Sequence, residues 1–225
     1  MLLRIQHIAI GCAVSLLVGL FFWPRGATAA VDRALAEAYR ESARYLAGAV
    51  EYAVGRCGAE PVSADAALQE RIEAAAAARR LDDAFRSYLA ERGPKPVPLA
   101  EMTPLVTGIA GLRLATDAVL GLWQRAGTPR PAADRTGARL VLLGAVGRVS
   151  GWYRDLAAAL RQDTPVGDPL PRNPVAEAEL VESLRRELSD EHGQATDTAV
   201  RMIWTADHLD AARRLQPGLA AAAGG

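Results

Sequence analysis

The 225-residue sequence predicts an all-α protein, with one N-terminal transmembrane helix followed by an antiparallel bundle of about five or six long helices. Three observations lead to this fold class. The chain begins with an apolar run long enough to cross a bilayer. Apolar residues then recur at steps of three and four, which is the period of amphipathic helices. No stretch alternates with period two and β-branched residues, so we expect no sheet.

The N-terminal run extends from Leu2 to Trp23, and we expect it to be the only segment long and apolar enough to span a membrane. As a helix it is about 33 Å long, against a hydrocarbon core of about 30 Å. No side chain is charged from Ile8 to Trp23, and aromatic residues gather at the end of the run, as they do at a membrane interface.

Within this run, Gly11, Ser15 and Gly19 stand at four-residue steps. Small residues at this spacing let membrane helices approach closely, so we expect this face to pack against other transmembrane helices. The membrane interface is predicted at Trp23, Pro24 and Arg25, where the proline kinks the chain before the next helix.

The distribution of arginines predicts the orientation of the span. Only Arg4 and the terminal amine precede it, and four arginines follow it closely: Arg25, Arg33, Arg40 and Arg44. Because positive charge is retained inside the cell, the C-terminal side is expected in the cytoplasm, at the inner membrane.

A cleaved signal peptide is the main alternative. Ala27-Thr28-Ala29 has the small-residue pattern of a cleavage site, so removal of residues 1–29 would leave a secreted helical protein. The arginine distribution opposes this interpretation, because a signal peptide carries its positive end at the N-terminus.

The first helix after the span is predicted by a stripe that repeats at steps of four and three: Val31, Leu35, Ala38, Ser42, Tyr45, Ala49 and Tyr52. Gly58 and Pro61 are expected to end it. Ser63 is the expected cap of the second helix. The apolar face of that helix is predicted at Leu68, Ile72, Ala75, Leu81, Phe85 and Leu89.

The third helix is expected to begin with Thr103 as its cap and Pro104 at its first position. Its predicted stripe is Leu105, Ile109, Leu112, Thr116, Val119 and Trp123. The fourth helix is predicted from Leu142, Val146, Val149, Tyr153, Leu156 and Leu160. Residues 164–174 contain four prolines and therefore predict a loop.

Two further helices are predicted toward the C-terminus. The stripe of the fifth is Val181, Leu184 and Leu188, and that of the sixth is Ala195, Ala199, Met202, Ala206 and Leu209. The predicted organisation is therefore a transmembrane helix at 1–24, a cytoplasmic helical bundle at 25–216, and a disordered Ala/Gly tail at 217–225.

The composition excludes several functional classes. The formal net charge is zero, so we expect no nucleic-acid partner. Of the histidines, His208 has Asp207 and Asp210 nearby, but no second histidine or cysteine joins them, so no metal site is predicted. No nucleophile elbow, CxxC pair or Gly-rich nucleotide loop is present, so we predict no catalytic residue, no cofactor and no enzyme.

The run RIQHIAIGCAVSLLVGLFFWPRGA resembles the last membrane helix of the fusaric acid resistance / aromatic acid exporter family. The matching positions are Arg4, Gly11, Trp23, Pro24, Arg25 and Gly26. Residues 199–215, AVRMIWTADHLDAARRL, resemble the closing helix of that family. The resemblance implies that the complete protein is a proton-driven permease that exports aromatic or other weak organic acids.

This chain departs from that family by having one predicted span, and one helix cannot enclose a substrate pathway. The resemblance therefore implies a C-terminal part of a permease, acting as a membrane-tethered structural or regulatory module. Its expected partners are the lipid bilayer and other transmembrane helices of the permease or its oligomer. The alternative from another class is a single-pass anchored scaffold that binds a protein partner through a face of its bundle.

Overall fold

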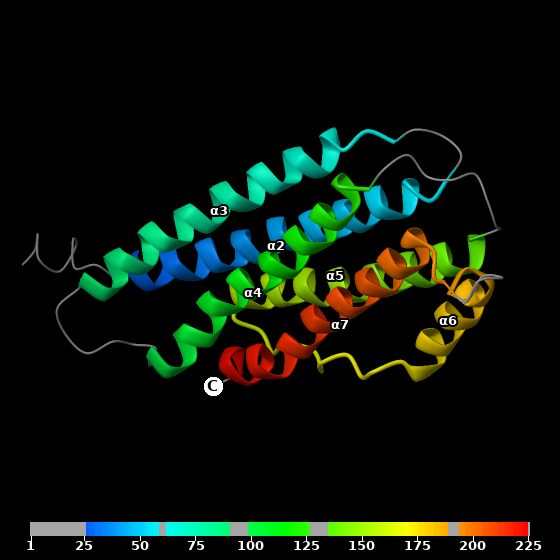
Figure 1. Cartoon of the computed structure of the whole chain (residues 1–225). Coiled ribbons are helices and arrows are strands. Elements are labelled where there is room, and N and C mark those ends of the chain that lie inside the picture. Colours follow the sequence, from blue (N-terminus) through cyan, green and yellow to red (C-terminus); the bar gives the residue numbers. More distant parts are fainter. Residues whose placement is uncertain (1–25, 59–61, 91–98, 127–134, 189–193, 225) are drawn as a thin grey trace, which may run out of the picture.

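The computed structural model describes residues 26–58, 62–90, 99–126, 135–188 and 194–224. These residues form six α-helices and no strand: α2 (Gly26–Gly55), α3 (Asp65–Ala90), α4 (Leu99–Gln124), α5 (Thr136–Gln162), α6 (Pro174–Leu188) and α7 (Asp197–Ala223). The helices pack as a bundle (Figure 1). The predicted all-α class is therefore confirmed for the described part of the chain.

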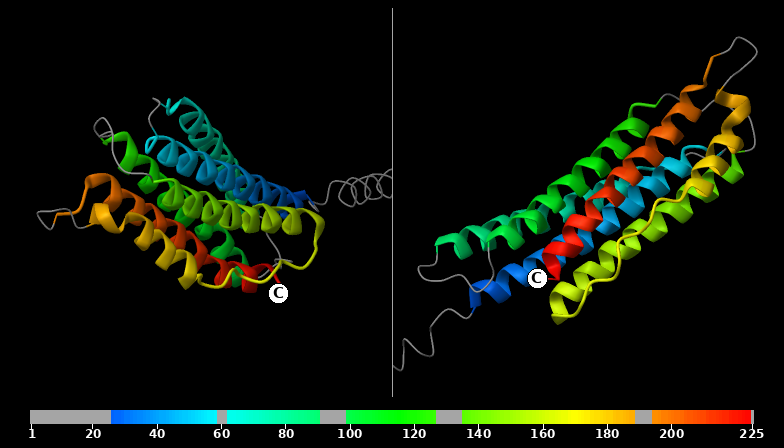
Figure 2. Two further views of the ribbon diagram at one scale, coloured as in Figure 1. Left: turned by 90° about the vertical axis from the view of Figure 1, so that its right-hand side faces the viewer. Right: turned by 90° about the horizontal axis from the view of Figure 1, so that it is seen from below.

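Helix α2 is the centre of the bundle, and α3, α4 and α5 pack around it (Figures 1 and 2). All seven residues of its predicted stripe are buried. Burial extends beyond that stripe to Tyr39, Leu46 and Val50, because neighbours cover α2 on several sides. Tyr39 stacks on Tyr153 of α5, with ring centroids 5.9 Å apart, and donates a 2.6 Å hydrogen bond to Leu105 O of α4.

The starts of α2 and α4 and the ends of α3, α5 and α7 lie at one end of the bundle (Figures 1 and 2). Helix α3 runs antiparallel to α2, α4 runs antiparallel to α7, and α6 lies against α5 and α7. The chain therefore enters the bundle through its central helix, and the C-terminus returns to the same end.

Helix α4 begins earlier than the sequence predicts. Its six-residue apolar stripe is fully buried, as expected, but the helix starts at Leu99, which leaves Pro104 inside it. The Thr103 hydroxyl donates to Leu99 O at 2.7 Å instead of capping the helix, and Met102 is buried. Packing of Met102 supports the additional turn before the proline.

The predicted apolar faces of α3 and α6 are partly wrong. On α3, Ile72 and Leu89 are 60% and 45% exposed. The helix buries the predicted Leu81 together with four residues that were not predicted: Ala67, Ala74, Ala77 and Tyr88. On α6, Val181 is 50% exposed and its neighbour Leu180 is buried. Adjacent residues lie 100° apart on a helix, so exchanging one for the other rotates the predicted face.

The predicted disordered tail at 217–225 is wrong as far as the structure describes it, because α7 continues through Pro217 to Ala223. Leu219 is only 3% exposed. A Cβ atom added to Gly108 of α4 would lie 2.5 Å from Leu219 Cδ2, so the two helices meet closely at this point. Burial of Leu219 explains the added helical turns.

The predicted transmembrane helix at 1–24 lies outside the described residues. Among those described, α4 alone has the length and composition of a membrane span, and 44% of its most apolar window is buried inside the bundle. The expectation that Leu2–Trp23 is the only such segment is therefore wrong. The buried part of α4 packs on α2 and α7.

Candidate functional site

A groove of about 580 Å³ lies between α5, α6 and α7. Its floor is apolar and includes Val141, Ala145, Val149, Leu180, Ile203, Ala206 and Leu209. Its rim carries seven charged residues: Arg148, Arg172, Glu177, Asp207, Asp210, Arg213 and Arg214. The groove thus combines an apolar floor with a border of both charges.

One end of the groove is formed by the non-helical segment 163–173, which confirms the predicted loop. It leaves α5 at Asp163, whose φ of 52° is left-handed and whose N–H donates to Ala159 O. Aspartate tolerates this conformation better than most residues. The Trp152 indole N–H then donates to Gly167 O and Asp168 O at 3.2 and 3.0 Å.

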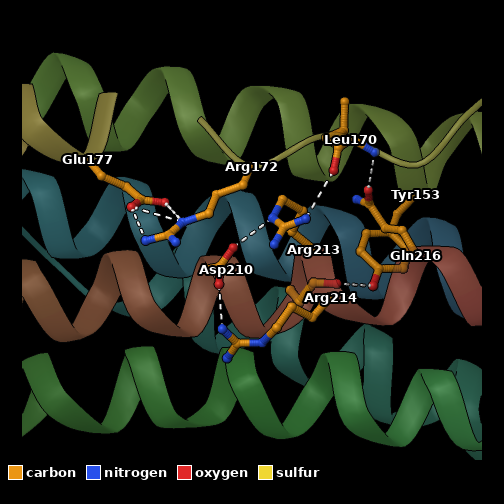
Figure 3. Close-up of polar contacts among 9 residues, drawn as sticks. Tyr153, Leu170, Arg172, Glu177, Asp210, Arg213, Arg214 and Gln216 are labelled. Carbon is orange, nitrogen blue, oxygen red and sulfur yellow. Dashed lines mark hydrogen bonds and ion pairs between the residues drawn. The ribbon is translucent and has the colours of Figure 1, made fainter. Parts of the chain in front are cut away.

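Helix α7 fixes the same segment through Leu170 (Figure 3). Arg213 Nη1 donates to Leu170 O at 3.1 Å, and Leu170 N donates to Gln216 Oε1 at 2.9 Å. Gln216 is fully buried, and Tyr153 beside it donates to Ala212 O at 2.7 Å. These contacts bind a loop without regular structure to two helices, so this end of the groove has a defined shape.

Ion pairs line both sides of the rim (Figure 3). Arg172 donates through Nε and Nη2 to the Glu177 carboxylate at 2.6–3.1 Å. This hydrogen bonding lowers the pKa of Glu177 below its ordinary value. Asp210 pairs with Arg213 at 2.6 Å and also with Arg214.

Two rim residues stay available to an occupant. Arg148 of α5 and Asp207 of α7 are exposed and make no hydrogen bond or ion pair with another described residue. The rim therefore leaves one cationic and one anionic side chain free to pair with an occupant of the groove.

A buried ion pair holds the far end of α6. Arg135 donates to Glu187 through Nε at 2.8 Å and through Nη2 at 2.6 Å, and both side chains are less than 10% exposed. Thr196 donates its hydroxyl to Glu187 Oε2 at 3.0 Å, and its N–H to Glu187 O at 2.7 Å. The start of α5, the end of α6 and the start of α7 meet here, so this contact fixes the separation of the groove walls.

The predicted site residues Gly11, Ser15, Gly19, Trp23, Pro24 and Arg25 all lie outside the described residues. His208 lies on α7 with Asp207 and Asp210, as the sequence suggests. The described residues contain no group of three or more His, Cys, Asp and Glu side chains that could hold a metal ion. Asp210 pairs with arginines instead.

The groove was not predicted from the sequence, because its lining residues come from three helices and a loop. The available signals were Pro-rich 163–173 and the closely spaced Asp210, Arg213 and Arg214. Such spacing produces ion pairs on any helix surface, so it does not indicate a groove.

The arrangement suits non-covalent binding. It presents an apolar floor and charges of both signs, with no paired nucleophile and base among its lining residues. Searches of protein-family models, curated proteins and solved structures find no match to this chain.

Proposed function

We propose that this chain is a membrane-tethered helical module that binds a protein partner, whose amphipathic helix lies in the groove between α5, α6 and α7. The observation that carries the proposal is the groove itself, with its apolar floor, its mixed rim and its two fixed ends.

The dimensions and charges of the groove favour a helix as the occupant. Along α7 the lining extends from Ile203 to Arg214, which is about 16 Å or three helical turns. An amphipathic helix of that length offers apolar side chains at steps of three and four to the floor. Acidic and basic residues beside the apolar face of that helix would pair with Arg148 and Asp207 of the rim. A ligand with a single charge would leave one of these two rim residues unpaired.

The membrane tether is supported by the apolar run Leu2–Trp23, which is separated by two residues from the start of the central helix at Gly26. The small-residue face at Gly11, Ser15 and Gly19 favours other membrane helices as neighbours of this tether. The arginines that follow the run favour a cytoplasmic bundle.

A second candidate is that the module forms the C-terminal part of an efflux permease for aromatic or other weak organic acids. The resemblance of residues 4–27 and 199–215 to the fusaric acid resistance / aromatic acid exporter family supports it. Coding sequence for further apolar spans, in frame before Met1 or in an adjacent gene, is the expected result. A neighbourhood without such spans would contradict it.

Site-specific photo-crosslinking in intact cells tests the proposed groove occupant. A photoreactive phenylalanine analogue replaces Val181, which lines the groove, or Ile72, which is similarly exposed on α3. We expect position 181 to label one partner on a segment with helical apolar periodicity, and position 72 not to label it. Equal labelling at both positions, or labelling of a non-helical segment, would contradict the proposed groove function.

Membrane fractionation tests the tether. The full chain is expected in the membrane fraction, with its bundle open to protease only from the cytoplasmic side. A mature chain that starts at Ala30 and appears in the periplasm or medium would show that the segment is a cleaved signal peptide.

A further inference from the structure

Five of the seven charged residues on the groove rim pair with one another, in the contact of Arg172 with Glu177 and in the two contacts of Asp210 (Figure 3). The charges of these five residues are therefore largely balanced within the protein. The two rim residues that make no pair with another described residue, Arg148 and Asp207, have opposite signs and come from different helices, α5 and α7.

Arg148 and Asp207 lie at the same level of the groove. Helices α5 and α7 run in the same direction, because their starts meet at Glu187 and their ends lie at one end of the bundle. Tyr153 of α5 donates to Ala212 O of α7 at 2.7 Å, and this contact fixes the register of the two helices. Arg148 precedes Tyr153 by five residues, and Asp207 precedes Ala212 by five residues. Each therefore lies about 7.5 Å before the contact, so the cation and the anion border the groove from the α5 wall and the α7 wall at one level.

A helix lying in the groove meets both walls at one level through residues that are two positions apart. In an α-helix, the residues before and after a given residue are turned by about 100° to either side of it and are only about 3 Å apart along the axis. When the central residue is apolar and points to the floor, one neighbour points to each wall. An acidic neighbour can then pair with Arg148 while a basic neighbour pairs with Asp207. Residues three or four positions apart share one face of a helix and reach the same wall.

We propose that the groove selects a partner helix with an acidic and a basic residue on either side of an apolar residue, the charged residues pairing with Arg148 and Asp207. These two residues then determine the specificity of the groove. Because the α-helix is right-handed, the order of the two charges in the partner sets the direction in which its helix lies. This inference rests on the proposed groove function and adds the sequence pattern that the groove recognises.

Binding of four helical peptides tests the charge pattern. Each peptide has about 14 residues, enough for the length of the groove, and is held helical by a hydrocarbon staple on its polar side. The peptides carry fluorescein and differ only in a central triplet: Glu-Leu-Lys, Glu-Leu-Glu, Lys-Leu-Lys or Gln-Leu-Gln. Fluorescence anisotropy measures their dissociation constants for the full chain in nanodiscs of zwitterionic lipid, with empty nanodiscs as the blank. We expect Glu-Leu-Lys to bind about three- to tenfold more tightly than the other two charged peptides, because each of those replaces an attractive contact with a repulsive one.

Charge reversal on each wall gives a sharper prediction. Arg148→Glu should shift the preference to Lys-Leu-Lys, and Asp207→Lys should shift it to Glu-Leu-Glu, because each wall contacts one side of the triplet. Arg154→Glu and Asp155→Lys, exposed on α5 outside the groove, are the controls and should leave the preference within about twofold of wild type. Retained melting temperatures show that the variants fold. Equal affinity for all four peptides, a preference that does not follow the reversals, or no binding of any peptide would overturn the inference. Crosslinking at position 181 decides the groove function separately from these outcomes.

The direction of the bound peptide provides a second test. In full chains in which Cys12 and Cys57 are replaced by alanine, one cysteine is placed by Asn173→Cys at the loop end of the groove, or by Val141→Cys toward its other end. Glu-Leu-Lys and Lys-Leu-Glu peptides with an N-terminal bromoacetyl group are added to each chain. We expect the two peptides to alkylate opposite cysteines, because reversing a helix of this length moves its N-terminus by about 20 Å. The same preferred cysteine for both peptides, or no preference, would overturn the inference.

Discussion

At the scale of single residues, two helical glycines have opposite roles. A Cβ atom on Gly108 would lie 2.6 Å from the Tyr39 hydroxyl and 2.5 Å from Leu219, and both of these side chains are buried. Gly147 of α5 is exposed, with nothing within 4 Å of an added Cβ atom. Glycine is therefore required for close packing at the first position and only weakens the helix at the second.

Alanine substitutions are expected to separate these roles. Gly108→Ala should lower the free energy of unfolding by about 1–3 kcal/mol, because Tyr39 and Leu219 must move. Gly147→Ala should raise it by about 0.5–1 kcal/mol through helix propensity. Urea unfolding followed by circular dichroism measures both changes. Stabilisation by Gly108→Ala would contradict the close contact between α4 and α7.

Glu70 is a partly buried carboxylate between α2 and α3. Its Oε2 atom lies over Gly48, 1.7 Å from where a Cβ atom would be, and has no hydrogen-bond partner among the described residues. Burial raises the pKa of Glu70 above its ordinary 4.5, and the nearby Glu51, Glu73 and Glu41 raise it further against the opposing effect of Arg44. Ionised Glu70 therefore disfavours the folded state.

The sign of this pKa shift predicts the pH dependence of a Glu70→Gln variant. Because the folded state binds the proton more tightly, the wild-type protein loses stability as pH rises from 4.5 through the raised pKa. Glutamine does not titrate, so the variant should melt at a higher temperature than wild type at pH 7, with the difference shrinking as pH falls through the raised pKa and smallest below pH 4.5. Glu179→Gln on exposed α6 is the control, and a difference that grows toward acid pH would contradict the prediction.

At the scale of elements, α6 depends on the buried pair between Arg135 and Glu187. Arg135→Ala should cost about 3–5 kcal/mol, because Glu187 remains buried without its partner. Replacing both residues, Arg135→Met with Glu187→Leu, should restore most of that loss. Denaturant unfolding of the two variants checks this, and equal losses would show that the cost comes from packing and not from the unpaired charge.

The end of α7 is a second element whose contribution can be measured. A chain that stops after Gln216 loses the buried Leu219 and should be less stable by about 2–3 kcal/mol. A chain that stops after Ala223 keeps the helix and should stay within about 0.5 kcal/mol of the full chain. Thermal unfolding distinguishes the two, and equal stability would support the disordered tail that the sequence suggests.

The stripes of α2 and α4 are predictable from the sequence, because each of these helices buries a row of apolar residues at steps of three and four. The face of α3 is not, because it packs on α2 through alanines such as Ala74 and Ala77, which lie within an almost continuous alanine run. Such a run has no periodicity in hydrophobicity, so the larger Ile72 is a misleading guide.

At the scale of the whole molecule, the number and class of the helices follow from the sequence, and the groove does not. Its floor joins Val141, Leu180 and Ile203, which are distant in the chain. Their proximity depends on how α5, α6 and α7 meet, and that depends on contacts such as Arg135 with Glu187. Residue patterns within one helix carry no information on these crossings.

A tether at the start of α2 has a geometric consequence for the bundle. Ser87 lies near the end of α3, at the same end of the bundle as the start of α2, where the proposed tether would attach. Ser63 precedes α3 at the other end, about 35 Å away. In cysteine-free protein reconstituted in bilayers, a fluorophore at Ser87→Cys should be quenched by a lipid-borne quencher, and one at Ser63→Cys should not. Equal quenching at both sites would contradict a tether at this end.

The first described helix, α2, is also the one around which α3, α4 and α5 pack. Any pull on the N-terminal segment is therefore applied along α2, and α3, α4 and α5 resist it together through side chains such as Tyr39 and Tyr45. Withdrawing α2 would break its contacts with three helices at once. Pulling on α6, at the periphery of the bundle, would break only the contacts of α6 with α5 and α7. We therefore expect the bundle to resist unfolding most strongly when a force is applied at the start of α2, where a membrane tether would attach.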